Sequence, residues 1–410
     1  MKATRLLGNP AFVFALLYLG YVISYIDRTA ITLALGHIGE DFSVGPAELG
    51  IVLSAFYLGY AAMQIPGGWL ADKYGSKRVI VVSIVLWSVF TIMTGLAWSL
   101  ASLLIIRFLF GLGEGSYPSS AMKGVAESYA RHARPKMTGL MTSSNYVGSF
   151  IAPLIIAPLI LWLGWRDVFL SIGAAGILFA LFYAFAVPRA PLVQDLQTNN
   201  TTQVKVSTRE LLHMPLLWKI VTVWFCLSLV NKGLDAWMPM YLLKARGLDL
   251  KTVGLLVPLP FIAASVASAA GGWLMTRYFD GREKLLMMGS CALTGIFLYG
   301  MYKSHSVTEV IVFQTAAYFF KSFVFATAFA LPTKILSQRL VGTGIGMVNF
   351  GGQAAGFVSP MVIGFLVSYT GSYDSAFLFL LAAVCASTLV SMTISARNVR
   401  DVQLANASEA

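Results

Sequence analysis

Long apolar runs separated by short polar or glycine- and proline-rich breaks make up most of the chain. A spanning helix needs roughly 20 mostly apolar residues, and twelve runs reach about that length. They fall at residues 11–36, 48–71, 78–99, 101–126, 137–161, 165–187, 216–243, 252–277, 284–302, 306–335, 343–369 and 374–396. The pattern predicts an all-α integral membrane protein with twelve transmembrane helices.

The longest non-apolar stretch divides these runs into two sets of six. It begins near Arg189, contains the polar run TNNTTQ and several charges, and ends near His213. A stretch of this composition is typical of a linker. We therefore expect an N-terminal six-helix bundle over 1–188, a linker over 189–214, and a C-terminal six-helix bundle with a short tail over 215–410.

Three features recur in the same order in both halves, which predicts two pseudo-symmetric bundles. The segment GGWLADKY at 67–74 returns as GGWLMTRY at 271–278. The second feature is a basic residue eleven positions before a proline, Arg107 and Pro118 in the first half and Lys321 and Pro332 in the second. The third is an asparagine followed by a proline, Asn145 and Pro153 in the first half and Asn349 and Pro360 in the second. Internal repeats with a site at their interface are typical of secondary transporters.

Two charged residues interrupt the fourth apolar run. Arg107 and Glu114 are seven positions apart, so they share one helix face. Each charge at membrane depth costs about 2.5–3.5 kcal/mol even on insertion scales. Such a stripe must contact protein or water rather than lipid. A buried structural ion pair is one interpretation, and the lining of a polar pathway is the interpretation that we favour.

Composition excludes several other classes of protein. Hydrophobic residues make up 57% of the chain and charged residues 11%, whereas soluble domains have about 25% charged residues. The three cysteines and four histidines lack metal-ligand spacing, and no nucleotide-binding loop is present. Since no nucleophile–base constellation stands out either, we expect neither an enzyme nor a cofactor.

The net charge of +11 is better explained by membrane topology than by nucleic-acid binding. Lysine and arginine are concentrated in alternate loops, including those after the second and fourth runs and the central linker. This asymmetry predicts cytoplasmic termini. The short loops favour a bacterial inner membrane.

The loop after the second apolar run carries a specific motif. The segment GWLADKYGSKR at 68–78 matches the inter-span motif of the major facilitator superfamily, which the whole chain resembles. Glycines permit close helix contact, and an aspartate is favourable at a facing helix N-terminus. The resemblance implies that this motif latches the two halves on the cytoplasmic side. The gating residues would be Gly68, Asp72, Gly75, Lys77 and Arg78.

Within that superfamily the chain resembles the anion:cation symporters, which include sugar-acid and sialin-like carriers. The resemblance rests on YIDR at 25–28, the tyrosines at 57–60, RFLFGLGEG at 107–115 and WMPMYL at 237–242. It implies a monomeric secondary active transporter in the lipid bilayer. Such a carrier imports an organic anion with protons by alternating access.

The resemblance also implies roles for single residues. Asp27 and Glu114 would bind the coupling protons, with Arg107 tuning Glu114, and Arg28 would bind the substrate carboxylate. The physical chemistry agrees, because arginine is a natural bidentate ligand for a carboxylate. The remaining candidates for substrate contact are Tyr25, Tyr60, Asn145, Trp237 and Asn349.

Three further charges lie in apolar runs of the second half. Lys232 and Asp235 are three positions apart and could neutralise each other, and Lys321 repeats the position of Arg107. Lys321 could pair with Asp27 or Asp235, or bind a substrate anion together with Lys232. The candidate cations are Arg28, Arg107, Lys232 and Lys321, and the candidate carboxylates are Asp27, Glu114 and Asp235. Their net charge is +1 when all are ionised and +3 when Asp27 and Glu114 are protonated. Protonation would therefore strengthen the attraction for an anion.

Two other functions stay open on the same features. A proton-coupled exporter of a drug or siderophore would have the same fold, but residues 148–153 lack the full glycine-proline signature of antiporters. A membrane receptor or lipid-handling protein would bind a ligand without transporting it. The direction of transport distinguishes an exporter from an importer. Ligand binding without counterflow would identify a receptor or lipid-handling protein.

Overall fold

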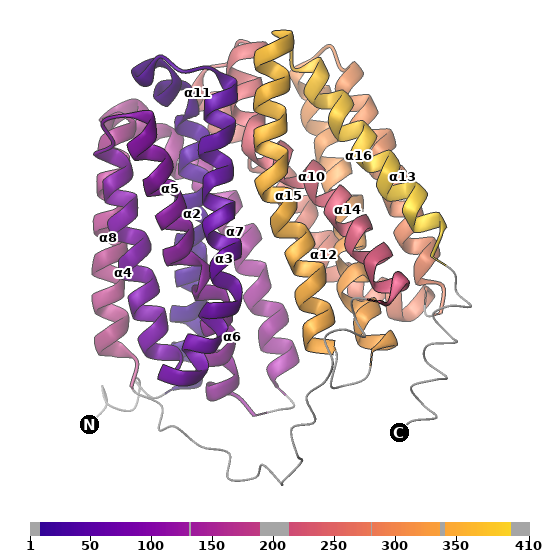
Figure 1. Ribbon diagram of the computed structural model, residues 1–410, viewed down its shortest axis with the longest axis horizontal. Helices are drawn as coiled ribbons and strands as arrows, with labels where there is room; N and C mark the ends of the chain where they lie inside the picture. The colour runs from indigo at the N-terminus through magenta and orange to yellow at the C-terminus, as the bar shows by residue number, and fades with distance from the viewer. Residues whose placement is uncertain (1–8, 131–132, 189–212, 280, 337–340, 395–410) are drawn as a thin grey trace. The chain divides into compact units, whose positions relative to one another are not determined.

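The chain is almost entirely helical wherever its structure is described. The computed structural model describes residues 9–130, 133–188, 213–279, 281–336 and 341–394, and Figure 1 shows that long helices dominate it. Within these residues there is no β-strand, and twelve helices are long and apolar enough to cross a membrane. The prediction of an all-α protein with twelve transmembrane helices is thus confirmed.

Seven helices make up the first six predicted spans. They are α2 (Pro10–Phe42), α3 (Pro46–Tyr74), α4 (Ser76–Gly95), α5 (Leu100–Gly115), α6 (Tyr117–Ser128), α7 (Arg134–Leu163) and α8 (Trp165–Ala186). α3 ends where Gly75 adopts a φ of 84°, a conformation that glycine tolerates, and α4 starts directly after it. This tight turn makes α3 and α4 neighbours at one end of the bundle.

The second set of spans is formed by the helices after the linker. They are α10 (Pro215–Met240), the π-helix η1 (Tyr241–Ala245), α11 (Leu250–Leu256), α12 (Leu259–Tyr278), α13 (Glu283–Lys303), α14 (Val307–Ile335), α15 (Val341–Thr370) and α16 (Asp374–Met392). Most of the predicted linker, 189–212, lies outside the described residues.

Three of the predicted spans contain a local irregularity. The fourth is interrupted at Ser116, where α5 stops and α6 begins with Pro118 in its first turn. The seventh continues from α10 into the π-helical turn η1. The eighth breaks between α11 and α12 next to Pro258 and Pro260, residues that cannot donate a backbone hydrogen bond.

By its internal contacts the chain divides into two compact units. The first is Met1–Leu196 with Pro239–Pro258, and the second is Gln197–Met238 with Leu259–Ala410. The segment 239–258 joins the first unit because α11 packs on α7, with Gly254 against the carbonyl of Pro153. Lys244 of the same segment also pairs with Glu40 of α2 at 2.8 Å. The division at 189–214 stays a prediction.

The three repeated sequence features fall on corresponding helices. The segment 67–74 ends α3 and the segment 271–278 ends α12, each the second span of its half. Arg107 and Lys321 lie in the fourth spans, and Asn145 and Asn349 in the fifth. The repeat seen in the sequence therefore coincides with a repeat of helices.

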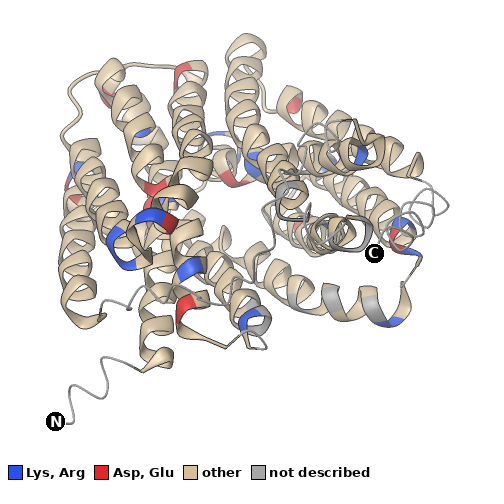
Figure 2. Cartoon of the chain, turned by 60° about the horizontal axis from the view of Figure 1, so that its bottom comes forward, with Lys and Arg blue, Asp and Glu red and all other residues tan. Residues whose placement is uncertain are grey.

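The outer surface of the helices is apolar. Large side chains such as Ile65, Trp162, Phe185 and Tyr369 are 80–92% exposed. Figure 2 shows charged residues only sparsely distributed along the helices. Exposed apolar surface on this scale is typical of contact with lipid. The protein is a multi-pass membrane protein.

Close helix packing inside the first unit depends on glycine. A Cβ at Gly59 of α3 would collide with the backbone oxygen of Phe108 on α5. We expect Gly59→Ala to destabilise the protein by about 1–3 kcal/mol, since the backbones cannot separate without losing other contacts. Thermal unfolding of the purified protein in detergent measures this effect.

Gly289 of α13 provides a matched control, because a Cβ there meets no atom within 4 Å. Gly289→Ala should be neutral or stabilise by up to about 1 kcal/mol through helix propensity. Equal melting temperatures for the two variants would contradict the packing argument.

Candidate functional site

An ion pair lies inside the first unit between α2 and α5. Arg28 Nε of α2 lies 2.7 Å from Glu114 Oε1 of α5. The hydroxyl of Ser24, one helical turn before Arg28, donates to the same carboxylate oxygen. The side chain of Glu114 is 1% exposed and that of Arg28 is 11% exposed. The structure therefore brings two of the predicted site residues into direct contact.

Aromatic rings surround the guanidinium of Arg28. Its Cζ lies 4.4 Å from the ring centroid of Tyr60, 4.8 Å from that of Tyr25 and 5.1 Å from that of Phe56. Cation–π contacts in a desolvated setting contribute about 2 kcal/mol or more. These rings hold the side chain in one orientation without neutralising its charge.

The end of the Arg28 guanidinium is available to a ligand. Its Nε is bonded to Glu114, and its two terminal nitrogens donate to no residue in the part of the chain that the structure describes. A guanidinium can bind a carboxylate through two parallel N–H groups. The arrangement can therefore bind an anionic group at one edge of Arg28 while Glu114 occupies another.

Close approach of α2 and α7 positions the same face of α2. A Cβ added at Gly148 of α7 would lie 2.6 Å from the Cβ of Tyr25, so only glycine permits this contact. Asn145 is one helical turn before Gly148, so it lies on a similar face of α7. Its Oδ1 is buried and accepts no hydrogen bond from any described residue. An unpartnered buried oxygen is suited to a polar ligand.

Arg107 lies deeper in the first unit. It is 2% exposed, and its guanidinium lies 4.5 Å from the ring centroid of Phe110. Its Nε has no hydrogen-bond partner among the described residues, although Glu114 and Asp27 are within electrostatic range. The direct hydrogen-bond partner of Glu114 is therefore Arg28, while Arg107, which the resemblance assigns to tuning Glu114, lies within electrostatic range of it.

Asp27 is the second buried carboxylate of this unit. It is 1% exposed, and its Oδ1 has no hydrogen-bond partner in the described structure. Glu114, Arg107 and the hydroxyl of Thr91 are its electrostatic neighbours. One oxygen of Glu114, Oε2, is buried and unpartnered in the same way. Each carboxylate thus has an oxygen that can accept a proton.

A separate polar network lies in the second unit, on α10 and α14. Lys321 donates to the side-chain oxygen of Asn231, and the amide of Asn231 donates to Asp235 at 3.1 Å. Tyr318 donates to the other oxygen of Asp235, and its ring lies 3.9 Å from the Lys321 ammonium. Lys321 is 8% exposed.

No described carboxylate lies within 4.0 Å of the Lys321 ammonium, so the predicted alternative of a direct ion pair is not formed there. Asn231 instead separates Lys321 from Asp235. A buried ammonium whose direct oxygen contact is neutral retains its attraction for an anion.

The second half contains three other residues that were predicted to contact the substrate. Trp237 is 3% exposed, and its indole N–H donates to the carbonyl of Pro360 at 3.0 Å. Its polar edge is therefore already engaged within the second unit. Lys232 of α10 and Asn349 of α15 are half-buried.

The predicted gating segment forms the turn between α3 and α4. Asp72 pairs with Lys123 of α6 at 2.9 Å, and Lys123 also donates to the carbonyl of Ala71. Gly68 and Lys77 are half-buried, and Arg78 is exposed. In this structure the partner of Asp72 is a lysine of its own unit rather than a helix N-terminus.

Sequence reasoning missed several residues that build these networks. Ser24 and Asn231 each lie four positions before a predicted charge, Arg28 and Asp235 respectively, so helical spacing could have identified them. Phe56 lies four positions before Tyr60 on α3. Thr91 gave no such signal, because Asp27, whose electrostatic surroundings include Thr91, lies on another helix.

The described residues contain no group of three or more His, Cys, Asp or Glu side chains that could hold a metal ion. The two networks consist of arginine, lysine, carboxylate, amide and phenol groups. Such groups bind anions and protons by charge and hydrogen bonding.

Twelve spanning helices with an internal repeat and buried charges define a membrane transporter. A family model described as Major Facilitator Superfamily matches residues 17–299 and 247–409. The chain belongs to this superfamily, and it is a transporter rather than an enzyme.

Curated relatives cover nearly the whole chain. A probable sulfoacetate transporter of Cupriavidus necator is 32% identical over 401 residues, which is 93% of each protein. A hexuronate transporter of Bacillus subtilis is 28% identical and covers 90% of each. A probable galactarate/D-glucarate transporter of Escherichia coli K12 is 27% identical, over 90% of this chain and 89% of the relative.

Solved structures share the fold. A bacterial homologue of the human lysosomal transporter Spinster, in an inward-facing and occupied conformation, has a TM-score of 0.81 at 20% identity. The match covers 97% of this chain and 98% of the other. A D-xylose–proton symporter has a TM-score of 0.75 at 14% identity. These likenesses extend over both halves and support the twelve-helix architecture.

Proposed function

We propose that the protein imports an organic anion together with protons, by alternating access of its two six-helix halves. The observation that carries this proposal is the half-buried Arg28, whose Nε contacts Glu114 while its terminal nitrogens have no described partner. The named substrates of the relatives are sulfoacetate, hexuronates and galactarate or D-glucarate. Each is an organic anion that an arginine can bind.

Arg28 is the principal substrate ligand in this proposal. Its guanidinium forms two hydrogen bonds with a carboxylate or sulfonate of the substrate. Tyr25 and Tyr60, whose rings flank the guanidinium, and Asn145, with its unpartnered oxygen, contact substrate hydroxyl groups. A substrate with several hydroxyls, such as a sugar acid, satisfies more of these polar groups than a simple carboxylate.

Glu114 and Asp27 couple protons to the substrate. The charges of Arg28 and Arg107 balance those of Asp27 and Glu114 when all four are ionised, and protonation of both carboxylates leaves two positive charges. Protonation of Glu114 also weakens its hold on Arg28 and so strengthens the attraction of Arg28 for an anion. Coupling requires such a change in substrate affinity, and it acts in both directions.

The second unit contributes Lys321, which binds a further anionic group, with Lys232, Trp237 and Asn349 as additional contacts. We expect Lys321→Gln to lower the uptake of galactarate, which has two carboxylates, by roughly tenfold or more. The uptake of galactonate, which has one, should change much less. Competition between the two labelled substrates in proteoliposomes measures this ratio.

Lys303→Gln is the matched control, since Lys303 is exposed at the end of α13. It should leave both rates unchanged. Equal losses for galactarate and galactonate in Lys321→Gln would show that Lys321 has a structural role only.

The proposal also includes the location of the protein, its gating segment and its partners. The short loops favour a bacterial inner membrane, and the bias of lysine and arginine towards alternate loops favours cytoplasmic termini. The turn with Gly68, Asp72, Gly75, Lys77 and Arg78 gates the cytoplasmic side. The protein works as a monomer with a small anion, protons and lipid as its partners, and with no nucleic acid.

The direct test is uptake by the purified full chain in proteoliposomes under an imposed inward proton gradient. Galactarate, glucuronate, galactonate and sulfoacetate are the labelled substrates. At least one should accumulate, and a protonophore should abolish the accumulation. Absence of accumulation for all four, or accumulation that a protonophore leaves intact, would contradict the proposal. Transport driven by an outward gradient only would support an exporter instead.

A further inference from the structure

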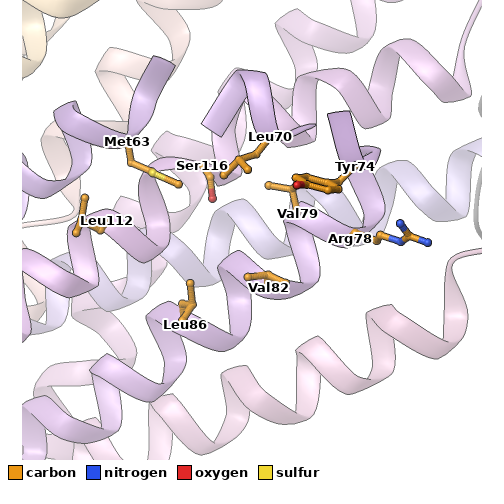
Figure 3. Close-up of a pocket in the computed structure, with 9 residues that line it drawn as sticks. All are labelled: Met63, Leu70, Tyr74, Arg78, Val79, Val82, Leu86, Leu112 and Ser116. Atoms are coloured by element: carbon orange, nitrogen blue, oxygen red, sulfur yellow. The ribbon is translucent and has the colours of Figure 1, made fainter. Parts of the chain in front are cut away.

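An apolar groove lies on the first unit, and its lining includes neither Arg28 nor Glu114. It is lined by residues of α3, α4 and α5 and by Ser116, and its volume is about 350 Å³. Ligand pockets range over roughly 300–1,000 Å³, so the groove is large enough for part of an elongated molecule. Figure 3 shows Met63 and Leu112 at one end and Tyr74 and Arg78 at the other.

The groove exists because α3 and α4 both pack on α5 while diverging from the turn at Gly75. α3 approaches the α5–α6 break closely, since a Cβ at Gly67 would lie 2.5 Å from the Cα of Ser116. α4 approaches α5 at Gly113, whose Cβ would lie 3.1 Å from that of Leu86. The space between these two contacts is left open on the outer side.

The walls of the groove are exposed and almost entirely apolar. Val82 is 56% exposed, Leu86 43% and Tyr74 45%, and all three lie in helices that span the membrane. Water has no polar partners along most of this surface. The groove is therefore suited to a hydrocarbon chain.

The end of the groove at the α3–α4 turn is positively charged. Arg78 lies in the first turn of α4, is exposed and forms no ion pair with any described residue. Lys73 lies nearby, with its ammonium 5.2 Å from the ring centroid of Tyr74. The nearest acidic residue of the turn, Asp72, is paired with Lys123.

We propose that this groove binds an anionic phospholipid of the cytoplasmic leaflet. One acyl chain lies along Val82, Leu86 and Leu112, and the phosphate is held by Arg78. An exposed arginine beside an apolar groove complements a negatively charged head group joined to a hydrocarbon chain. The site is distinct from the proposed substrate site, and it does not depend on which anion the protein transports.

The test uses the full-length protein in detergent micelles, titrated with phosphatidylglycerol or phosphatidylcholine of identical acyl chains and monitored by native mass spectrometry. The wild type should retain phosphatidylglycerol preferentially. Arg78→Gln should reduce its retention about fivefold and remove the preference, because one basic side chain near the head group is lost. Inorganic phosphate alone should not compete, since it lacks the acyl chain.

Val82→Trp tests the apolar part of the site, because the larger side chain fills the groove. It should lower the retention of both lipids, whereas Val89→Trp, on the same helix but outside the groove, should behave as the wild type. Helix content by circular dichroism verifies that each variant is folded. The proposal is overturned if Arg78→Gln keeps the lipid preference, or if the two tryptophan variants retain lipid equally.

Discussion

Replacing Arg28 with lysine is expected to reduce uptake of the organic anion by roughly 30-fold or more, because the paired N–H groups that bind the substrate carboxylate are lost. Lysine keeps the positive charge but cannot contact Glu114 through one nitrogen and the substrate through two others. It also lacks the planar group whose Cζ lies 4.8 Å from the ring centroid of Tyr25 and 4.4 Å from that of Tyr60. The defect should be a higher substrate KM in proteoliposome uptake.

Arg166→Lys is the matched control for this prediction. Arg166 lies in the first turn of α8, is 39% exposed and donates to the carbonyls of Gly95 and Ala97, which a lysine can also reach. It should transport normally. An Arg28→Lys protein with the wild-type KM would remove Arg28 from the substrate site.

The two buried carboxylates are expected to have separable effects on proton coupling. Both Asp27→Asn and Glu114→Gln should lose accumulation driven by an inward proton gradient, by about 5–150-fold, the usual range of a coupling free energy. Neither amide can take up and release a proton. Glu114→Gln should retain exchange of substrate across the membrane, because glutamine can still accept the hydrogen bonds of Ser24 and Arg28.

Gradient-driven accumulation and counterflow, measured on the same proteoliposomes, distinguish these outcomes. Glu40→Gln is the matched control, because Glu40 is an exposed carboxylate of α2 that pairs with Lys244. It should keep its response to the proton gradient. Unchanged accumulation in both Asp27→Asn and Glu114→Gln would end the assignment of the protons to these residues.

The helices could be predicted from sequence because a bilayer requires long apolar segments. Each predicted run overlaps a helix of the described structure, as with 165–187 and α8 at Trp165–Ala186. The break at Ser116 was not predicted, since the run 101–126 is apolar on both sides of it. Hydrophobicity measures partition into lipid, and it does not determine whether a helix is continuous.

Some residues of the candidate site could also be predicted from sequence, because charges are costly in a bilayer. Charges within apolar runs are rare, so Asp27, Arg28 and Glu114 stood out individually. Their contact did not follow from spacing, because spacing relates residues of one helix, as it placed Arg107 and Glu114 on one face. In the folded unit Glu114 contacts Arg28 of α2 instead.

The sequence by itself determined that this protein spans a membrane twelve times, that its halves repeat, and that charged residues lie within its spans. These are properties of single segments, and they follow from the cost of placing polar groups in hydrocarbon. Only the tertiary structure decided that Arg28 contacts Glu114, that Asn231 separates Lys321 from Asp235, and that a groove ends at Arg78. Each of these depends on which helix faces interdigitate, and that is set by contacts between segments far apart in the chain.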